Sequence, residues 1–416
     1  MGNPVAGIAG ELLEAAARAT EAADPGALAD AIARLAGWML EGVAGQHDEG
    51  YARWLVIEPA FHALDLALWE RSPVNVETLA LALARVTFYR HTDLGREEVI
   101  ALLARVRKLL SPRHHLACAN VDLQRAELVS MRKRKEDLDH ALTLCDDALA
   151  SVEQLEDGTT RGDAWLTRAH VLARCSRVPE ALADAEKARV IFAAHDQTQG
   201  LSNVRLFLAE MHLAGGRIPE AAILAGEAIE GFRQRRDSIS EGNVLLLRAQ
   251  TWKHRGKALR AFQDCEDAVR LYEVARARTS QGRALLLRAQ FLSGAARYPE
   301  AQLDLETALR YLRESPEAFV FALALLRLAA VLCRRHAAEG AARRLDEAEA
   351  ALGRLEHAPD QVVLLLEVCR VGKELPTPDK PRIRRCSAAA LGLARALGDA
   401  EWEQAATAFA GFAGVF

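Results

Sequence analysis

The sequence predicts an all-α protein, a solenoid of antiparallel helix pairs with atypical helical caps at both ends. Three observations favour this fold: a 40-residue internal repeat, helical spacing of apolar residues inside each repeat, and an unusual composition. Of the 416 residues, 50% are hydrophobic but only 6% are aromatic, so the apolar content is Ala, Leu and Val. Small and aliphatic side chains suit closely packed helices. Periods of roughly 20–50 residues are typical of arrays whose units pack against their neighbours.

The repeat is visible both as a short motif and as a register of small residues. The motif, a basic residue followed by an apolar residue, Pro, Glu and Ala, begins at Arg177, Arg217 and Arg297, with a variant at Lys257. Three series of small residues keep the same 40-residue period. They are Ala141, Ala181, Ala221, Ala261, Ala301 and Ala341; Ala148, Ala188, Ala228, Ala268, Ala308 and Ala348; and Ala169, Ala209, Ala249, Ala289 and Ala329, with Val129 in the earliest copy.

Each repeat contains two stretches with apolar residues at i, i+3, i+4 and i+7, as on one face of a helix. In one copy they run roughly over 164–174 and 179–193. Pro179, Pro219 and Pro299 stand where the second helix begins, a position where a missing N–H costs nothing. The Ala series mark the points where antiparallel helices approach too closely for a larger side chain. One such pair cannot bury its apolar face alone, so neighbouring units are expected to stack and share a core.

The combination of Ala169, Ala181 and Ala188 with Trp165 and Leu172 resembles the small-and-large signature of tetratricopeptide repeats. The 40-residue length is similar to the longer subtype found in MalT-like regulators, Rap-type quorum sensors and LGN-type scaffolds. The resemblance implies a right-handed α-solenoid, a superhelix whose concave wall is built by the first helix of each unit. It also implies a protein that binds partners.

The resemblance covers about residues 121–356, six units. Prolines between 375 and 381 interrupt the rhythm, and two closing helices are expected at about 383–397 and 400–413. The expected organisation is an N-terminal helical cap at 1–75, a degenerate repeat at 76–120, the repeat array at 121–372 and C-terminal capping helices at 373–416.

The sequence contains no motif that predicts catalysis or a cofactor: there is no GxGxxG, P-loop, HExxH or GxSxG. His114, His115 and Cys118 are too few to close a tetrahedral metal site by themselves. We therefore expect no enzyme activity, no cofactor and no metal. Seven scattered Cys favour reduced thiols, and neither a signal peptide nor an apolar run long enough to span a membrane is recognised, so a cytoplasmic location is expected.

The candidate partner-binding sites lie on the first helix of each unit, at the positions that the resemblance places in the groove. Three residues before the small Ala stand Leu166, Leu206, Leu246, Leu286 and Leu326, and one residue after it stand His170, Glu210, Gln250, Gln290 and Ala330. A Leu stripe flanked by amides suits an apolar or amphipathic peptide. The alternative is that the Leu stripe is buried between helices.

A second candidate is a basic stretch between 105 and 135 that includes Arg132, Lys133, Arg134 and Lys135, which we expect at the end of a helix. It could bind nucleic acid or an acidic protein surface, or be a solvated helix end. With 53 Lys and Arg against 57 Asp and Glu, general nucleic-acid binding is disfavoured. The sequence therefore predicts a scaffold for a peptide or protein, with a regulatory sensor and a nucleic-acid-associated subunit as alternatives. It leaves the oligomeric state open.

Overall fold

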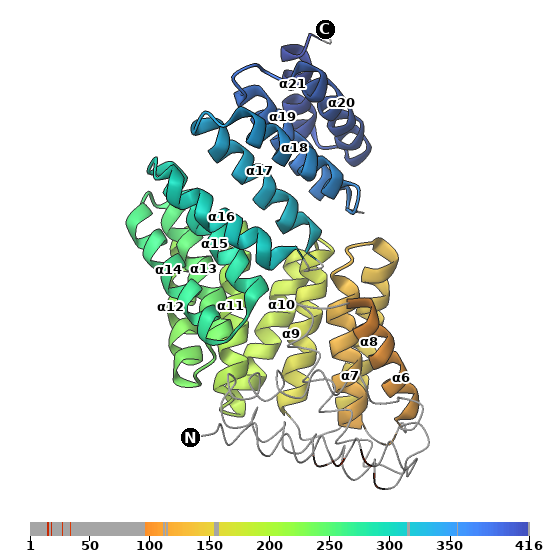
Figure 1. Ribbon diagram of the computed structural model, residues 1–416. Coiled ribbons are helices and arrows are strands. Elements are labelled where there is room, and N and C mark those ends of the chain that lie inside the picture. Colours follow the sequence, from red (N-terminus) through yellow and green to blue (C-terminus); the bar gives the residue numbers. More distant parts are fainter. Residues whose placement is uncertain are drawn as a thin grey trace. The chain divides into compact units, whose positions relative to one another are not determined.

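The computed structural model describes residues 96–110, 113, 115–153, 158–313, 317–355 and 357–414, together with four isolated helical residues, Ala15, Arg18, Ala27 and Arg34. Every regular element in these ranges is an α-helix, so the predicted all-α fold is confirmed (Figure 1). None of these helices is both long and apolar enough to cross a membrane. The expected N-terminal cap at 1–75 and the first part of the degenerate repeat lie outside the described ranges.

The chain divides into two compact units, the first ending at Arg255 and the second beginning at Gly256. The helices described in the first unit pack against one another in chain order. They are α6 (Arg96–Leu109), α7 (His115–Ser130), α8 (Lys135–Val152), α9 (Gly158–Arg174), α10 (Val178–Ala194), α11 (Thr198–Ala214), α12 (Ile218–Gln234) and α13 (Ser238–His254).

The second unit contains eight described helices, α14 to α21, which also pack in chain order. They are α14 (Ala258–Val274), α15 (Arg278–Gly294), α16 (Tyr298–Leu312), α17 (Ala318–Arg334), α18 (Ala338–Leu352), α19 (Ala358–Glu374), α20 (Lys380–Leu397) and α21 (Ala400–Phe412). The last two agree with the closing helices expected from the sequence. The expected division after residue 120 falls inside α7 and the one after 372 falls inside α19, and this organisation stays a prediction.

Two kinds of helix alternate along the repeats. We call the first helix of each 40-residue repeat an A helix (α7, α9, α11, α13, α15, α17 and α19) and the second a B helix (α8, α10, α12, α14, α16, α18 and α20). A helices also contact A helices of neighbouring repeats: α7 with α9, α9 with α11 and α11 with α13 in the first unit, and α15 with α17 and α17 with α19 in the second. In each unit the A helices therefore form a continuous wall, here called the A-helix wall.

The three series of small residues lie at the helix crossings. All seventeen Ala side chains and Val129 are buried, each no more than 2% exposed. Pro179, Pro219 and Pro299 lie in the first turn of α10, α12 and α16, as predicted. The sequence thus places both the tight crossings and the helix starts.

A fourth small position, Gly, Ser or Ala, lies seven residues before the Ala of α9, α11, α13, α15 and α17, and in α9 and α15 a large side chain packs over it. A Cβ on Gly162 would lie 2.5 Å from Cε1 of Phe192, and a Cβ on Gly200 would collide with the same ring. In the second unit, a Cβ on Gly282 would lie 3.0 Å from Cγ of Leu312. Because the glycines leave room, these large side chains fill the space between helices and are almost completely buried.

The turns recur every 20 residues, because helices of 17 residues alternate with turns of three. Eight of the described turns contain a residue in the left-handed region at this spacing: Ser176, Asp196, Gly216, Arg236, Gly256, Arg276, Ala296 and His336. The next amide then donates to the carbonyl five residues earlier, as from Arg177 to Leu172 at 2.9 Å. This bond closes the helix end and sets the direction of the next helix.

The helix crossings make a prediction about stability. Ala228→Leu and Ala268→Leu should each lower the free energy of unfolding by about 1–3 kcal/mol, because the packed crossing has no room for the added carbons. Ala193→Leu, at an exposed position of α10, is the control and should change it by less than about 0.5 kcal/mol. Urea denaturation measures all three. If both buried variants cost as little as the control, the repeat register is wrong.

The turn geometry predicts that one substitution has opposite signs at two nearby glycines. Gly216 has φ of +73°, so Gly216→Ala should destabilise the protein by about 1 kcal/mol. Gly226 lies inside α12 with no atom within 4 Å of an added Cβ, so Gly226→Ala should stabilise it by about 0.5–1 kcal/mol. Thermal unfolding monitored by circular dichroism compares the two. Equal effects would contradict the assigned turn.

Candidate functional site

The A-helix wall of the second unit contains a recess of about 400 Å³, which we call the A-wall recess. It is bounded by α15, α17 and α19, with part of α16 between them. Ala289, Leu305, Ala330 and Val331 give it an apolar lining. Its volume falls within the range of pockets that bind small molecules or peptide side chains.

The polar residues of the recess keep the 40-residue register. Gln290, Ala330 and Arg370 stand one residue after the small residue of α15, α17 and α19, and Arg334 and Glu374 stand five after it. Two positions expected in the groove, Gln290 and Ala330, therefore line this recess, and their role in binding stays a prediction. Arg370 and Glu374 lie at equivalent positions that sequence reasoning did not extend to.

The Leu residues three before each small Ala lie to one side of the exposed face of the A-helix wall. Leu326 is fully buried and Leu166 is 6% exposed, so these two belong to the helix core, the alternative left open by the sequence. Leu206, Leu246 and Leu286 are half-buried. At about 100° per residue, the position three before the small Ala is rotated about 40° towards the core from the position one after it. The Leu stripe therefore borders the wall rather than forming its centre.

In the first unit, the side chains one residue after the small Ala of each A helix differ in burial. Glu210 and Gln250 are exposed, while His170 is partly buried and meets the ring of Phe207 edge-on, with centroids 4.6 Å apart. Burial, with a smaller effect of the Arg174 charge, lowers the pKa of His170 to about 4. His170 is therefore neutral at pH 7 and acts as a packing group between α9 and α11.

Five charged residues form an alternating ladder on α17 and α19. Arg327 contacts Glu367 at 3.2 Å, Glu367 contacts Arg370 at 2.7 Å, Arg370 contacts Glu374 at 2.5 Å, and Glu374 contacts Arg334 at 3.6 Å. Burial raises the pKa of Glu367, but the hydrogen bond from Arg370 and the nearby positive charges outweigh it, so the net shift is downward. Glu367 therefore stays ionised at neutral pH, and the ladder joins the two A helices.

The sequence held a signal for this ladder. Arg327 and Glu367 are 40 residues apart, as are Arg334 and Glu374, so opposite charges occupy equivalent positions of neighbouring repeats. Such positions face the same side of adjacent A helices. The earlier repeats carry other residues at these positions. A comparison that looks for the same residue in every repeat therefore does not detect the two pairs.

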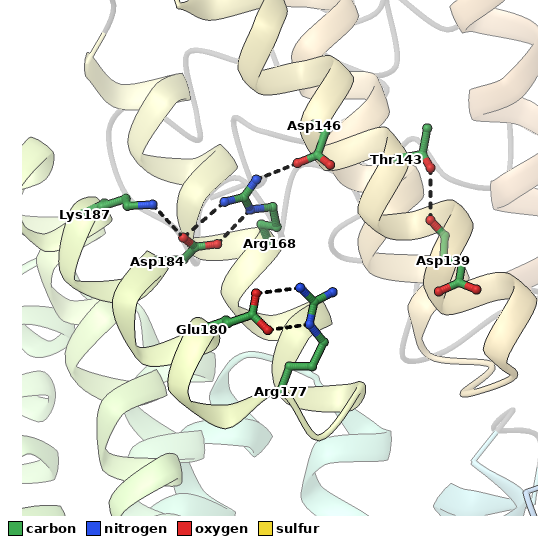
Figure 2. A network of polar contacts seen from close by, with 8 residues as sticks. All are labelled: Asp139, Thr143, Asp146, Arg168, Arg177, Glu180, Asp184 and Lys187. Atoms are coloured by element: carbon green, nitrogen blue, oxygen red, sulfur yellow. Dashed lines mark hydrogen bonds and ion pairs between the residues drawn. The ribbon is translucent and has the colours of Figure 1, made fainter.

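A second recess, of about 290 Å³, lies among α8, α9 and α10 in the first unit. Figure 2 shows its polar network: Arg168 joins Asp146 of α8 at 2.6 Å and Asp184 of α10 at 2.7 Å, and Lys187 reaches Asp184 at 3.1 Å. Arg177 pairs with Glu180. Three cations face three carboxylates in this network, so it ties three helices together with no excess charge.

The basic stretch is placed differently from the prediction. α7 ends at Ser130, and α8 begins at Lys135, so Arg132, Lys133 and Arg134 form the turn between two helices instead of ending one. The expectation of cations favoured by a helix C-terminus is therefore wrong. Lys133 occupies the left-handed position of the turn, with φ of 58°.

Carboxylates compensate much of this positive charge. Arg132 donates to Glu97 at 2.9 Å and to Asp137 at 2.9 Å, and Nε of Arg134 lies 4.0 Å from Asp137. Elsewhere in the stretch, Arg107 contacts Asp122 at 2.7 Å. The stretch is thus held in ion pairs between α6, α7 and α8.

The described residues contain no group of three or more His, Cys, Asp or Glu arranged to hold a metal ion. All seven thiols are free and six of them are buried. Burial raises the pKa of Cys265 to about 12 and that of Cys386 to about 11. These thiols are protonated at neutral pH, and a protonated thiol is a poor nucleophile and metal ligand.

The low pKa of His170 predicts a pH-dependent stability. Between pH 6.5 and 4, the unfolded chain binds a proton that folded His170 refuses, so the free energy of unfolding should fall as the pH decreases through this window. We expect a loss of about 1–3 kcal/mol, which His170→Gln should remove. Urea denaturation at several pH values measures it. His254→Gln, exposed at the end of α13, is the control, and an equal effect of both variants would contradict the assignment.

No family model and no curated protein matches the sequence. Solved structures do match. A Rap protein complexed with competence and sporulation factor has a TM-score of 0.55 at 11% identity, covering 92% of this chain and 99% of that one. Aspartyl phosphate phosphatase F from Bacillus subtilis has a TM-score of 0.52 at 12% identity, covering 89% and 95%.

A third match is a signal-transduction ATPase (STAND protein) with a tetratricopeptide repeat sensor, from Pyrococcus horikoshii. Its TM-score is 0.55 at 14% identity, covering 87% of this chain and 55% of that one. Identities this low establish the fold alone. With the buried small-residue series and the alternating A and B helices, they show that the protein has the fold of tetratricopeptide-like helical repeat proteins.

Proposed function

We propose that this protein is a non-catalytic scaffold that binds a peptide or a partner protein on its A-helix wall. The single observation that carries the proposal is the A-wall recess, where three successive A helices surround an apolar lining with a polar rim. Gln290 and Ser293 offer amide and hydroxyl groups that can hydrogen-bond a peptide main chain. The neighbouring apolar side chains can receive a side chain of the same peptide.

The fold supports binding at low ordering cost. Short turns with a fixed left-handed residue and close-packed crossings hold the A helices in place before a partner arrives. A surface ordered in advance loses little conformational entropy on association, so more of the contact energy appears as affinity. The seven free thiols fit our further proposal that binding takes place in the cytoplasm.

The structural neighbours agree with this function without specifying it. One of them is a Rap protein complexed with competence and sporulation factor, and the fold likeness makes a peptide or protein partner a reasonable choice here too. Another neighbour is named as a phosphatase. We do not carry that activity over, because the likeness extends to the fold and no further.

A regulatory role is the second candidate. One neighbour contains its tetratricopeptide repeats as a sensor, which favours a version of the scaffold that responds to a peptide or small effector. A nucleic-acid-associated role through the basic stretch is less favoured, because Glu97, Asp122 and Asp137 neutralise its arginines. The nucleic-acid candidate differs from the scaffold in the surface that contacts the ligand.

Site-specific photo-crosslinking in the native host tests the scaffold. A photoreactive amino acid at Gln290 or Ala330 should crosslink one recurring partner, identified by mass spectrometry. The same probe at Gln263 of α14 or Leu303 of α16, both exposed on B helices, should give little of that partner. Circular dichroism checks that each variant folds. If the partner crosslinks from the B helices and not from Gln290 or Ala330, the A-helix wall is not the binding surface.

A further inference from the structure

The A-wall recess carries an excess of positive charge. Arg327, Arg334 and Arg370 line it, and Glu374 is the one carboxylate among its lining residues. The rest of the lining is apolar or uncharged. Glu367, outside the lining, pairs with Arg327 and Arg370, so the three cations meet two anions and one positive charge remains in excess. A concave site with this balance favours a negatively charged ligand.

The two ends of the charged ladder are the groups available to such a ligand. Arg327 meets Glu367 at 3.2 Å and Arg334 meets Glu374 at 3.6 Å, with side chains 36% and 60% exposed. A guanidinium carries five N–H donors, so one carboxylate contact leaves donors for a second. Arg370, by contrast, holds Glu367 and Glu374 at 2.7 and 2.5 Å and has less to offer.

The spacing of these two arginines sets the spacing of the ligand's charges. They lie seven residues apart on α17, which is about 10.5 Å along the helix axis. A peptide in the polyproline II conformation advances about 3.1 Å per residue and repeats its side-chain direction every three residues, so carboxylates three residues apart face the same side and come close to this distance. The apolar lining, with Ala330 and Val331, lies on the same stretch of α17 and suits an apolar side chain between them.

We propose that the A-wall recess binds an acidic peptide segment, in which two carboxylates about three residues apart pair with Arg327 and Arg334. An apolar residue between these carboxylates enters the recess. This inference rests on the proposed scaffold function and names the chemistry of its partner. Charge-assisted bonds from guanidinium to carboxylate supply both the attraction and the register. A nucleic acid fits less well, because the apolar lining between the two arginines offers nothing to phosphates.

Substitution of Glu374 should tighten binding, a result that a loss of folding cannot produce. In the free protein Glu374 occupies Arg370 and Arg334, and it would repel an incoming carboxylate. Removing its charge should therefore strengthen binding of an acidic peptide. Removing the charge of Arg327 and Arg334 should weaken it.

The test uses the full chain and a displayed library of random 12-residue peptides. Selected peptides should be enriched in Asp and Glu about three residues apart. Fluorescence polarisation of a labelled selected peptide then gives affinities. Arg327→Gln with Arg334→Gln should weaken binding at least about tenfold, the equivalent of about 1.4 kcal/mol, and Glu374→Gln should tighten it about threefold. Arg310→Gln, exposed on α16, is the control and should leave the affinity unchanged.

Several results would overturn the proposal. Selected peptides that are neutral or basic, a library that yields no binder, or tighter binding of a poly(U) RNA probe than of the acidic peptide would each do so. The proposal would also be wrong if the double Arg variant kept its melting temperature and still bound the acidic peptide with unchanged affinity. If selected peptides without acidic preference crosslink from Gln290, the acidic chemistry fails and the scaffold stands. If they crosslink from Leu303, the scaffold itself fails.

Discussion

The structure depends on one packing constraint: a large side chain of a B helix fits where the neighbouring A helices carry almost no side chain. Phe192 fills the space left by Gly162 and Gly200, and Leu312 packs closely over Gly282. Because the helices approach at these points, the Ala series around them must also stay small. A repeat that combines one large residue with several small ones therefore lets successive helices pack closely.

The turns set the direction of each helix, so that successive A helices lie side by side in the A-helix wall. Each three-residue turn closes its helix with the same backbone bond and sends the chain back at a fixed angle, whether the left-handed residue is Gly or a residue such as Arg276. Successive A helices then present equivalent positions to the same side. In the second unit, the residues one or five after the small residue, such as Gln290 and Glu374, line the recess. Substitutions at these positions can change the ligand without disturbing the core.

Much of the fold, and less of the site, could be predicted from the sequence. The buried Ala series and the Pro at the start of α10, α12 and α16 follow directly from the repeat. The fourth small position was missed because Ser202 and Ala322 interrupt the series of Gly162, Gly242 and Gly282, so it is less regular than the Ala series. The Leu stripe lies about 40° nearer the core than the position one after the small Ala, and the burial of Leu166 and Leu326 became visible only in the packed helices. The charged ladder spans only two repeats, and pairing between α17 and α19 becomes visible only when the helices are side by side.

The central claim is that ligands contact the A-helix wall. Hydrogen–deuterium exchange of the full chain, with and without its bound peptide or protein partner, tests it most directly. We expect slower exchange at 286–294, 326–334 and 366–374, the segments of α15, α17 and α19 around the A-wall recess, while α14 and α18 stay unchanged. Protection confined to α14, α16 and α18 would contradict it.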